Sequence, residues 1–366
     1  MLSSIKLRNF KAFSDQTFPL APLSLFMGEN GAGKSSVIQS LLLLRQSMDS
    51  GDLVGRSLNL NGHLCSIGAG VDLLRQGADE EEITVELTNS EGLVSTYDFG
   101  YDPAADRLPM LSRNVVLPEM SHETFTYLTA ERMGPRLTNP RLMAKAAKRD
   151  MGIHGEGALA VLEEFRAHIL DANDPRRRGL SGSLEELFQS YLRDISPNAR
   201  VELKSYNQVD SIGSSFSFTA AGGLPGLPFR PTNVGFGLSY CLPILVACLV
   251  ATPGSMLVIE NPEAHLHTKS QRAVCDLLVR TAQAGTQVLI ETHSREFFHW
   301  LRNRASDGSI PSNIGCMNYL EASDVGGQRV SRCSSLTSLD ESLLGWPQNF
   351  FDAYGSPTDL IAPVTY

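Results

Sequence analysis

Residues 28–35, Gly-Glu-Asn-Gly-Ala-Gly-Lys-Ser, have the residue types and spacing of a phosphate-binding loop. Gly31 and Gly33 allow backbone N–H groups to point into one concavity, where they and a helix N-terminus bind phosphate oxygens. Lys34 supplies a positive charge at the β- and γ-phosphates, and the Ser35 hydroxyl ligates Mg²⁺. The pattern predicts a site for ATP with Mg²⁺. The residues assigned to it are Asn30, Gly31, Ala32, Gly33, Lys34, Ser35 and Ser36.

A second set of candidate residues follows an apolar run at 256–259, which ends in Glu260-Asn261-Pro262-Glu263. In enzymes with a phosphate-binding loop, an acid at the end of a buried strand holds the water shell of Mg²⁺. Many core strands end in Glu, so this interpretation depends on the loop upstream. We therefore expect Glu260 to contact the metal through water.

A third apolar run, 288–290, is followed by Glu291-Thr292-His293-Ser294. A single histidine is usually a structural residue. Here His293 follows the strand that comes next after Glu260, so we expect it to hydrogen-bond the γ-phosphate.

The composition is that of a folded chain with a sizeable core. The 366 residues allow about two domains or one large α/β unit, and 42% of them are hydrophobic. The net charge of -9 and the pI near 5.4 exclude an even positive coat for nucleic acid. The amino terminus lacks the apolar core of a signal peptide, and the apolar stretch at 238–251 is too short to cross a bilayer. We expect a cytoplasmic protein without a membrane partner.

Hydrophobic periodicity predicts the elements that position these motifs. From residue 232 onward the predicted order is helix, strand, helix, strand, helix, and the stretch 238–251 is expected to be a buried helix. A hairpin is predicted at 201–206 and 215–219. The other expected strands are 5–7, 23–27, 83–87, 94–99 and 125–128, and the other expected helices are 34–45, 157–170 and 183–194.

Positive charge is concentrated in residues 130–180, which contain ten basic and seven acidic residues. Charge runs usually form a solvated helical face, and that interpretation stays open beside a nucleic-acid contact. The candidates for such a contact are Arg141, Lys145, Lys148, Arg149, Arg176, Arg177 and Arg178.

The three motifs, in this order and with this separation, resemble the ATP-binding cassette (ABC) ATPases of the SMC, RecF, Rad50 and OLD group. The start at 7–13, Leu-Arg-Asn-Phe-Lys-Ala-Phe, and the string at 260–267, Glu-Asn-Pro-Glu-Ala-His-Leu-His, are also similar to that group. The resemblance covers about residues 1–130 and 200–320. It implies an α/β fold, a P-loop ABC-ATPase head with a β-rich N-terminal lobe at 1–130, a mainly helical insertion at 131–199 and a C-terminal lobe at 200–366.

Such heads also carry a signature segment that completes the ATP site of a second subunit. The stretch 231–240 stands in the corresponding place, before the buried helix. The resemblance implies a homodimer, or a higher oligomer of dimers, in which these residues contact the partner's ATP at a helix N-terminus. The residues assigned to this role are Asn233, Gly235, Gly237 and Ser239.

The sequence departs from that group at the catalytic position. Glu260 replaces the usual aspartate, and Asn261 occupies the position of the usual catalytic glutamate. An amide orients water but accepts no proton, so either hydrolysis is slow or Glu263 acts as the base. His265 and His267 are expected at a subunit interface rather than on a metal.

Several strings resemble a compact subfamily of bacterial ATPases often encoded beside effectors in phage-defence clusters. They include 127–136, 155–158 and 346–352. The resemblance implies an ATPase that acts as a regulatory switch with a separate effector protein such as a nuclease. A RecF-like DNA-repair ATPase and an ATP-binding scaffold with little hydrolysis are the alternatives. Gln46 and Gln76 are both candidates for the glutamine that senses the γ-phosphate.

Overall fold

The computed structural model describes residues 1–114, 125–179, 182–219, 226–325 and 328–355. The chain forms two compact units. Unit 1 comprises Met1–Phe125 with Arg302–Tyr366, and unit 2 comprises Thr126–Leu301. The predicted insertion at 131–199 and the predicted C-terminal lobe up to residue 301 therefore share one unit.

The first sheet of unit 1 is antiparallel and has the strand order β2-β1-β5-β6-β7-β4. Apolar residues alternate with polar ones along its strands, and Ile83, Val85 and Leu87 of β5 are buried. The predicted strands at 5–7, 83–87 and 94–99 lie in this sheet, whereas three of its other strands, at 13–19, 57–59 and 107–113, were not predicted. The bounds are β1 Leu2–Phe10, β2 Phe13–Pro19, β4 Ser57–Asn59, β5 Glu82–Asn89, β6 Val94–Gly100 and β7 Arg107–Arg113.

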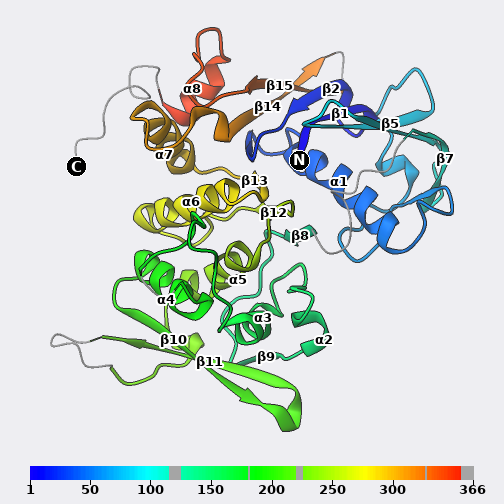
Figure 1. Cartoon of the computed structure of the whole chain (residues 1–366). Coiled ribbons are helices and arrows are strands. Elements are labelled where there is room, and N and C mark those ends of the chain that lie inside the picture. The colour runs from blue at the N-terminus through cyan, green and yellow to red at the C-terminus, as the bar shows by residue number, and fades with distance from the viewer. Residues whose placement is uncertain (115–124, 180–181, 220–225, 326–327, 356–366) are drawn as a thin grey trace. The chain divides into compact units, whose positions relative to one another are not determined.

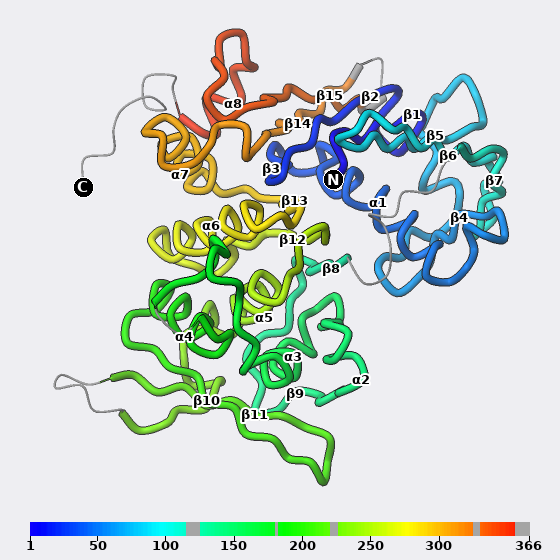
Figure 2. The backbone as a smooth tube through the Cα atoms, viewed as in Figure 1, coloured from blue at the N-terminus to red at the C-terminus, as the bar shows by residue number. Residues whose placement is uncertain are grey.

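Unit 1 also contains β3 (Leu23–Gly28), which pairs in parallel with β14 (Gly315–Val325). Strand β14 pairs antiparallel with β15 (Gln328–Leu336). The C-terminal strands thus lie beside the N-terminal ones, as the orange and blue segments show in Figure 2. Helix α1 (Lys34–Asp49) follows β3 and buries its leucines, and the short helix α8 (Gln348–Tyr354) comes after β15.

Unit 2 contains the predicted order of helices and strands from residue 232 onward. Strands β12 (Met256–Glu260) and β13 (Gln287–Glu291) are parallel, and β8 (Phe125–Leu128) lies on the other side of β12. Helix α5 (Phe236–Val250) is buried almost throughout and continues through Pro243. Helices α6 (Thr268–Gln283) and α7 (Arg295–Ser306) follow β12 and β13, and the last residues of α7 belong to unit 1.

The remainder of unit 2 is the inserted region, where α3 (Ala158–Phe165) and α4 (Leu184–Ile195) pack on α5. The predicted hairpin is confirmed as β10 (Ala199–Tyr206) paired with β11 (Ser211–Phe218), and β9 (Thr138–Pro140) adds a third strand. Figure 1 shows this sheet and the β12–β13 pair at opposite ends of unit 2, with helices between them.

Two predicted helices in this region have different outcomes. Ser183 caps α4 by accepting a hydrogen bond from the backbone N–H of Glu186, as predicted. The helix predicted at 157–170 ends at Phe165, because Leu170 donates its backbone N–H to Gly182 and Ile169 bridges to Ser183. Between residues 131 and 157 the only described helix is the four-residue α2 (Met143–Ala146), so this part is largely irregular.

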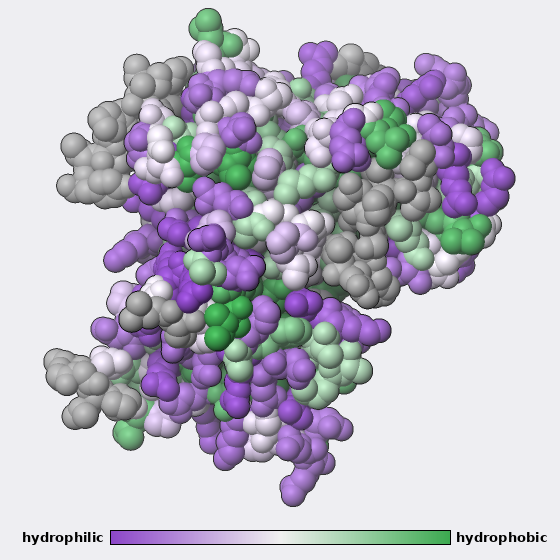
Figure 3. Space-filling view, in the orientation of Figure 1, coloured by the Kyte–Doolittle hydropathy of each residue, from purple (hydrophilic) through white to green (hydrophobic). Residues whose placement is uncertain are grey.

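Across the described ranges, no helix combines the length and apolarity that a membrane span requires. The face of the molecule in Figure 3 is largely hydrophilic around the end of unit 2 that carries β10 and β11.

Candidate functional site

The predicted phosphate-binding loop connects β3 to α1, which is the strand-loop-helix context that the motif requires. Gly31 and Gly33 have φ values of 74° and 99°, in the left-handed region that glycine adopts without strain. A Cβ on Gly33 would lie 2.6 Å from the Phe13 ring. The two glycines are therefore required by backbone conformation and, at Gly33, by close packing.

The first glycine of the loop packs directly on β14. A Cβ on Gly28 would lie 1.9 Å from the backbone oxygen of Leu320, and the N–H of Glu29 donates to that oxygen at 3.3 Å. Asn349 of α8 donates from Nδ2 to Glu29 Oε1 at 3.2 Å. Residues from the C-terminal part of the chain thus hold the start of the loop.

Lys34 lies inside its own loop. Its side chain is 4% exposed, and Nζ donates to the carbonyl oxygens of Gly28 (3.0 Å) and Glu29 (2.7 Å). Ser35 follows at the exposed first turn of α1. A buried ammonium group that binds backbone oxygens is placed to exchange them for phosphate oxygens, because both are hydrogen-bond acceptors and a phosphate also carries negative charge.

In unit 2, Glu260 ends β12 as predicted, and its carboxylate is bound by the end of β8 and by the residues that follow it. Oε1 accepts from Tyr127 Oη at 2.9 Å, and Oε2 accepts from the N–H of Ala130 at 3.0 Å and from Thr129 Oγ1 at 3.4 Å. These partners were not predicted as site residues. The string 127–132 was noticed only as a family likeness, and nothing in its spacing relates it to a residue about 130 positions later.

The backbone conformation at position 261 explains why asparagine occurs there. Its φ is 44°, a left-handed conformation that asparagine tolerates better than glutamate does. Its N–H donates to the carbonyl oxygen of Glu291 at 2.7 Å, which ties the end of β12 to the end of β13. Its side-chain Oδ1 is buried and accepts no hydrogen bond from the described residues.

Glu263 and His293 lie next to each other. The backbone N–H of His293 donates to Glu263 Oε1 at 2.8 Å, while Glu263 Oε2 is buried without a hydrogen-bond partner in the described part of the chain. Burial raises the pKa of Glu263, and backbone hydrogen bonds, the Thr292 side chain and the charge of Arg132 only partly oppose this rise. A carboxylate with a raised pKa and one unsatisfied oxygen is suited to accept a proton.

The motif around His293 also has a structural part. Ser294 Oγ accepts from the N–H of Phe297 at 3.1 Å and so caps the start of α7, and it donates to Gln271 Oε1 at 2.7 Å. His293 itself is exposed.

The four candidate signature residues differ in exposure. Asn233 is exposed in a single turn of 3₁₀-helix (Pro231–Asn233), and a Cβ on Gly235 would meet nothing within 4 Å. By contrast, a Cβ on Gly237 would lie 2.4 Å from the carbonyl oxygen of His265, and Ser239 is buried. The inward position of Ser239 contradicts its assignment to a partner's ATP, because its hydroxyl does not reach the surface.

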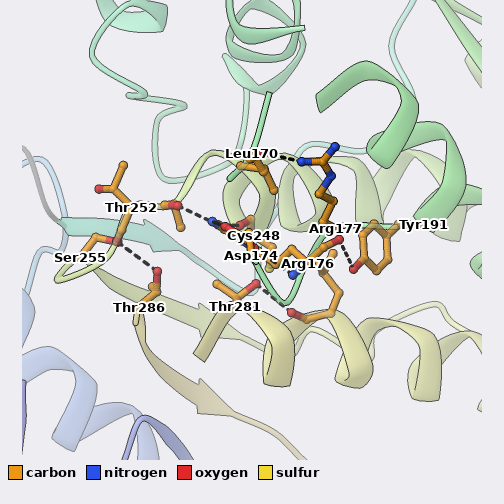
Figure 4. A network of polar contacts seen from close by, with 12 residues as sticks. Leu170, Asp174, Arg176, Arg177, Tyr191, Cys248, Thr252, Ser255, Thr281 and Thr286 are labelled. Atoms are coloured by element: carbon orange, nitrogen blue, oxygen red, sulfur yellow. Dashed lines mark hydrogen bonds and ion pairs between the residues drawn. The ribbon is translucent and has the colours of Figure 1, made fainter. Parts of the chain in front are cut away.

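The Arg176–Arg178 run is engaged in contacts within the subunit, which argues against the prediction that these three residues contact nucleic acid; Arg176 is buried, and Arg177 and Arg178 are partly exposed. Arg176 is 2% exposed and donates from Nη1 to the carbonyl oxygens of Cys248 and Ala251 at the end of α5 (Figure 4). Its Nη2 pairs with Asp174 Oδ2 at 2.6 Å. The guanidinium donors of Arg176 are therefore bonded inside the subunit.

The two neighbouring arginines are also engaged. Arg177 donates from Nη1 to the carbonyl oxygen of Leu170 at 3.2 Å (Figure 4). Arg178 pairs with Asp194 and Asp276 and lies over the Tyr191 ring at 3.8 Å.

The other predicted basic residues are partly engaged. Arg141 pairs with Glu163 at 2.6 Å, and Arg149 lies over the Phe165 ring at 4.6 Å. Lys145 lies 3.8 Å from Asp150, and Lys148 is exposed. The exposed positive charge of this segment is therefore smaller than its composition indicates.

The structure gives no support to either candidate for the glutamine that senses the γ-phosphate. Gln46 is buried and uses its amide internally: Nε2 donates to the carbonyl oxygen of Asn59 at 2.8 Å, and Oε1 accepts from the N–H of Cys65 at 3.1 Å. Gln76 is exposed. Within the described ranges, no three His, Cys, Asp or Glu side chains form a cluster that could hold a metal ion, and His265 instead packs against Phe236 and Tyr240.

The structure thus brings together Glu260, Asn261, Glu263 and His293 in unit 2. The phosphate-binding loop, with Lys34 and Ser35, belongs to unit 1.

Two protein families match the sequence. Residues 1–104 match the family described as "AAA ATPase domain", and residues 147–298 match the family described as "AAA domain, putative AbiEii toxin, Type IV TA system". The first match contains the phosphate-binding loop and the second contains the acidic strand and His293. No curated protein matches the sequence.

The fold is similar to solved SMC heads. The crystal structure of the SmcHead bound to the C-winged helix domain of ScpA aligns with a TM-score of 0.53 at 15% identity, over 93% of this chain and 98% of that one. An Smc head with an extended coiled coil, bound to the C-terminal domain of ScpA derived from Pyrococcus furiosus, aligns with a TM-score of 0.53 at 12% identity, over 93% and 96%.

These findings define the class of protein. The fold is that of an SMC head, and both parts of the sequence match AAA ATPase families. The chain is therefore similar in fold to the heads of SMC proteins and in sequence, over two separate segments, to AAA ATPase domains.

Proposed function

We propose that the chain binds and hydrolyses ATP and that two copies dimerise around the nucleotide. The observation that carries the proposal is the state of Lys34, whose buried ammonium group is satisfied by two carbonyl oxygens of a glycine-rich loop at a helix N-terminus. The second requirement is a set of buried oxygen acceptors beside a histidine, and residues 260–263 of unit 2, here called the acidic turn, supply it. Turnover requires both sets of residues.

The donors in both sets fit Mg²⁺, which prefers oxygen ligands and keeps several of its waters. Ser35 would supply a hydroxyl, and Glu260 would accept from metal-bound water. The buried, unpartnered oxygens Asn261 Oδ1 and Glu263 Oε2 supply further acceptors for such waters. When bound with ATP, the ion neutralises charge on the phosphates.

The residues of the acidic turn divide the remaining chemistry. Asn261 would orient the attacking water through Oδ1, and Glu263 would take its proton on Oε2. The backbone N–H of His293 fixes the other oxygen of Glu263, so the carboxylate presents one defined face. The raised pKa of Glu263 brings its proton affinity closer to neutral pH, which favours general-base catalysis.

For the dimer, we propose that the signature contact consists of Asn233 and Gly235, with Gly237 and Ser239 acting inside the subunit. The exposed amide of Asn233 and the open backbone at Gly235 precede the first turn of α5, where backbone N–H groups attract an anion. Two copies related by a two-fold axis would then place each signature segment at the other copy's nucleotide.

At the level of biology, we propose a cytoplasmic regulatory switch that acts on a separate effector protein, such as a nuclease, in anti-phage defence. Support comes from the matched family, whose description names a Type IV TA system, and from the SMC heads, which are bound to domains of another protein, ScpA. A RecF-like DNA-repair role would require exposed basic residues for DNA. Arg176, Arg177 and Arg178 instead donate hydrogen bonds within the subunit, which argues against that role.

Phosphate release with Mg-ATP tests the proposal. We expect turnover in the wild-type protein and a loss of about 10²- to 10³-fold or more in Lys34→Ala, because one charged donor to the phosphates is removed. Lys6→Ala is the matched control, since that lysine pairs with Asp15 on the partly exposed edge of the same unit. ATP binding without turnover in the wild type would instead establish the scaffold alternative.

A further inference from the structure

Arg132 is a buried arginine that the proposed chemistry leaves without a role. It is 4% exposed and follows the segment that binds the Glu260 carboxylate. Its Nη1 donates to the carbonyl oxygens of Thr129 (2.9 Å) and Glu260 (2.5 Å), and its Nη2 donates to the carbonyl oxygen of Asn261 (2.6 Å). One guanidinium group therefore holds two consecutive carbonyl groups of the acidic turn.

The contact with Arg132 restrains the backbone of Asn261, where the chain changes direction after β12. Asn261 has a φ of 44°, and its N–H is already bound to β13. With its carbonyl oxygen held by Arg132, both backbone polar groups of Asn261 are fixed on opposite sides. The planar guanidinium fork makes both contacts at once, which an ammonium group does with less geometric definition.

The same guanidinium contacts the beginning of α5. Its central carbon lies 4.3 Å from the centroid of the Tyr240 ring, a cation–π distance, and the Tyr240 hydroxyl donates to the carbonyl oxygen of Ala130. Tyr240 stands one turn after Gly235 and Phe236, at the start of the helix that the signature segment leads into.

A second path connects the same two elements. His265, just beyond the acidic turn, packs on Phe236 at 4.5 Å and on Tyr240 at 5.0 Å between ring centroids. The carbonyl oxygen of His265 lies where a Cβ on Gly237 would be, so helix and loop are in direct backbone contact. A shift of the first turn of α5 therefore requires a shift of the acidic turn, because packed contacts of this kind do not deform continuously.

Burying the charged guanidinium group of Arg132 costs free energy. Burial lowers the pKa of Arg132, while the nearby Tyr240, Glu263 and Glu260 oppose that effect. Its Nε is buried and has no partner among the residues that the structure describes. Arg176 differs from Arg132 in one respect. It is also buried and donates to two carbonyl oxygens, at the other end of α5, but it pairs in addition with the carboxylate of Asp174.

We propose that Arg132 is a positioning residue: it holds the Glu260–Asn261 backbone in register with the first turn of α5, so that the signature segment and the acidic turn move as one body. A nucleotide-bound second copy that engages Asn233 and Gly235 would thereby set the geometry of the water-orienting turn. The inference rests on the proposed ATPase function for its consequence in turnover, but its geometric part is independent of that function.

The test compares Arg132→Lys with Arg176→Lys, which keep the positive charge and replace the guanidinium fork of a buried arginine by an ammonium group. For Arg132→Lys we expect kcat for phosphate release to fall about 10- to 100-fold with KM for ATP within about twofold, because the turn is misplaced while the phosphate-binding loop is intact. Arg176→Lys should lower Tm and leave kcat unchanged. Equal losses of kcat in both variants, or none in Arg132→Lys, would overturn the proposal.

Hydrogen–deuterium exchange of the nucleotide-free proteins gives a readout that does not depend on activity. In Arg132→Lys we expect faster exchange in both 257–266 and 232–240, whereas in Arg176→Lys faster exchange should be confined to the end of α5 and residues after it. Faster exchange in 257–266 alone would refute the coupling. If wild-type protein releases no phosphate, the proposed function fails, and exchange still decides the role of Arg132.

Tyr240→Phe covers the case in which Arg132→Lys does not fold. It removes the hydroxyl contact to Ala130 and keeps the ring beneath the guanidinium. We expect a smaller loss of kcat, about 2- to 5-fold for one neutral hydrogen bond, with the same two peptides exchanging faster. Unchanged exchange in both peptides would contradict the proposal.

Discussion

The phosphate-binding loop of unit 1 and the acidic turn of unit 2 each satisfy a charged side chain with hydrogen bonds, but the hydrogen-bond partners come from different parts of the chain. Lys34 is satisfied by carbonyl oxygens five and six residues before it. Glu260 is satisfied by Tyr127, Thr129 and Ala130, about 130 residues before it. The charge of Lys34 is thus satisfied within its own loop, whereas the charge of Glu260 is satisfied by tertiary contacts.

The difference determines what each region tolerates. Lys34 loses its two partners when the backbone of its own loop is disturbed. An assembled site depends on several segments, so it is sensitive to residues that never touch a substrate. Four predictions examine this contrast, in order of decreasing expected effect.

The largest effect is expected for Glu263→Gln, which removes the proposed base and keeps the shape of the side chain. Turnover should fall about 10²- to 10⁴-fold, with ATP binding retained because the phosphate-binding loop is untouched. The rate of the wild-type enzyme should rise with pH through the raised pKa of Glu263. Steady-state phosphate release between pH 5 and pH 8 checks both expectations.

Stability gives a second readout for the same residue. Burial raises the pKa of Glu263 in the folded state, so the folded protein binds more protons than the unfolded chain above the ordinary Glu value of about 4.3. Wild-type stability should therefore decline as pH rises from there through the raised pKa, and the decline should be smaller in Glu263→Gln. A decline of the same size in both proteins would show that Glu263 is not the group that titrates.

The next effect concerns the phosphate-binding loop. Gly28→Ala would place a Cβ 1.9 Å from the Leu320 carbonyl oxygen at a φ of 132°, and we expect a loss of about 3 kcal/mol or more from strain and overpacking together. The ATP-dependent increase in Tm should disappear. Gly51→Ala is the control, because Gly51 has a φ of 79° in open space. It should cost about 1–2 kcal/mol and leave the ATP-dependent increase intact.

These two regions also explain what was predictable. The glycines, Lys34 and the strand-loop-helix context could be predicted, since each depends on neighbours within eight residues. Glu260 and His293 were predicted to lie near each other because they follow consecutive strands, and Asn261 and Glu263 were assigned from the family resemblance. The strands β12 and β13 indeed pair side by side. Tyr127 and Arg132 could not be predicted as their partners, because no periodicity connects β8 with a strand about 130 residues later.

Misinterpreted residues have the same origin. The Arg176–Arg178 run was predicted as a surface from its charge alone, while its partners Asp174, Cys248 and Asp276 lie on three different segments. Ser239 was assigned to a partner's ATP by counting along the signature segment, but helical geometry turns its side chain inward. In both cases the sequence shows that a residue is polar, but tertiary contacts determine whether its side chain points to the surface or into the subunit.

A smaller effect is expected for Asp174→Asn, which tests whether the arginine run is structural. Burial disfavours ionisation of Asp174, but hydrogen bonds from Arg176 outweigh it and lower the pKa. A lowered carboxyl pKa stabilises the fold above the unfolded value of about 3.9, and this contribution is lost as pH falls through the folded value. We expect Asp174→Asn to cost about 1–3 kcal/mol at pH 7. The difference from wild type should shrink below about pH 4.

Asp171→Asn is the control for that experiment, because Asp171 is exposed three residues earlier. Denaturant unfolding at pH 7 and pH 3 measures all three proteins. A loss in Asp171→Asn equal to that in Asp174→Asn would remove the special role of the Arg176 pair.

The smallest effect is expected in the basic segment, where an exposed lysine is compared with an ion-paired arginine. Lys148 is exposed, whereas Arg178 pairs with Asp194 and Asp276 and stacks on Tyr191. If this segment contacts nucleic acid, Lys148→Ala should reduce the slope of log affinity against log salt by about 1. Arg178→Ala should lower Tm and leave that slope unchanged, since its donors are occupied. Binding of duplex DNA measured from 50 to 200 mM salt decides between the two. A slope that changes only in Arg178→Ala would mean that the ion pairs of the arginine open when DNA binds, and a wild type that does not bind DNA would exclude the nucleic-acid role of this segment.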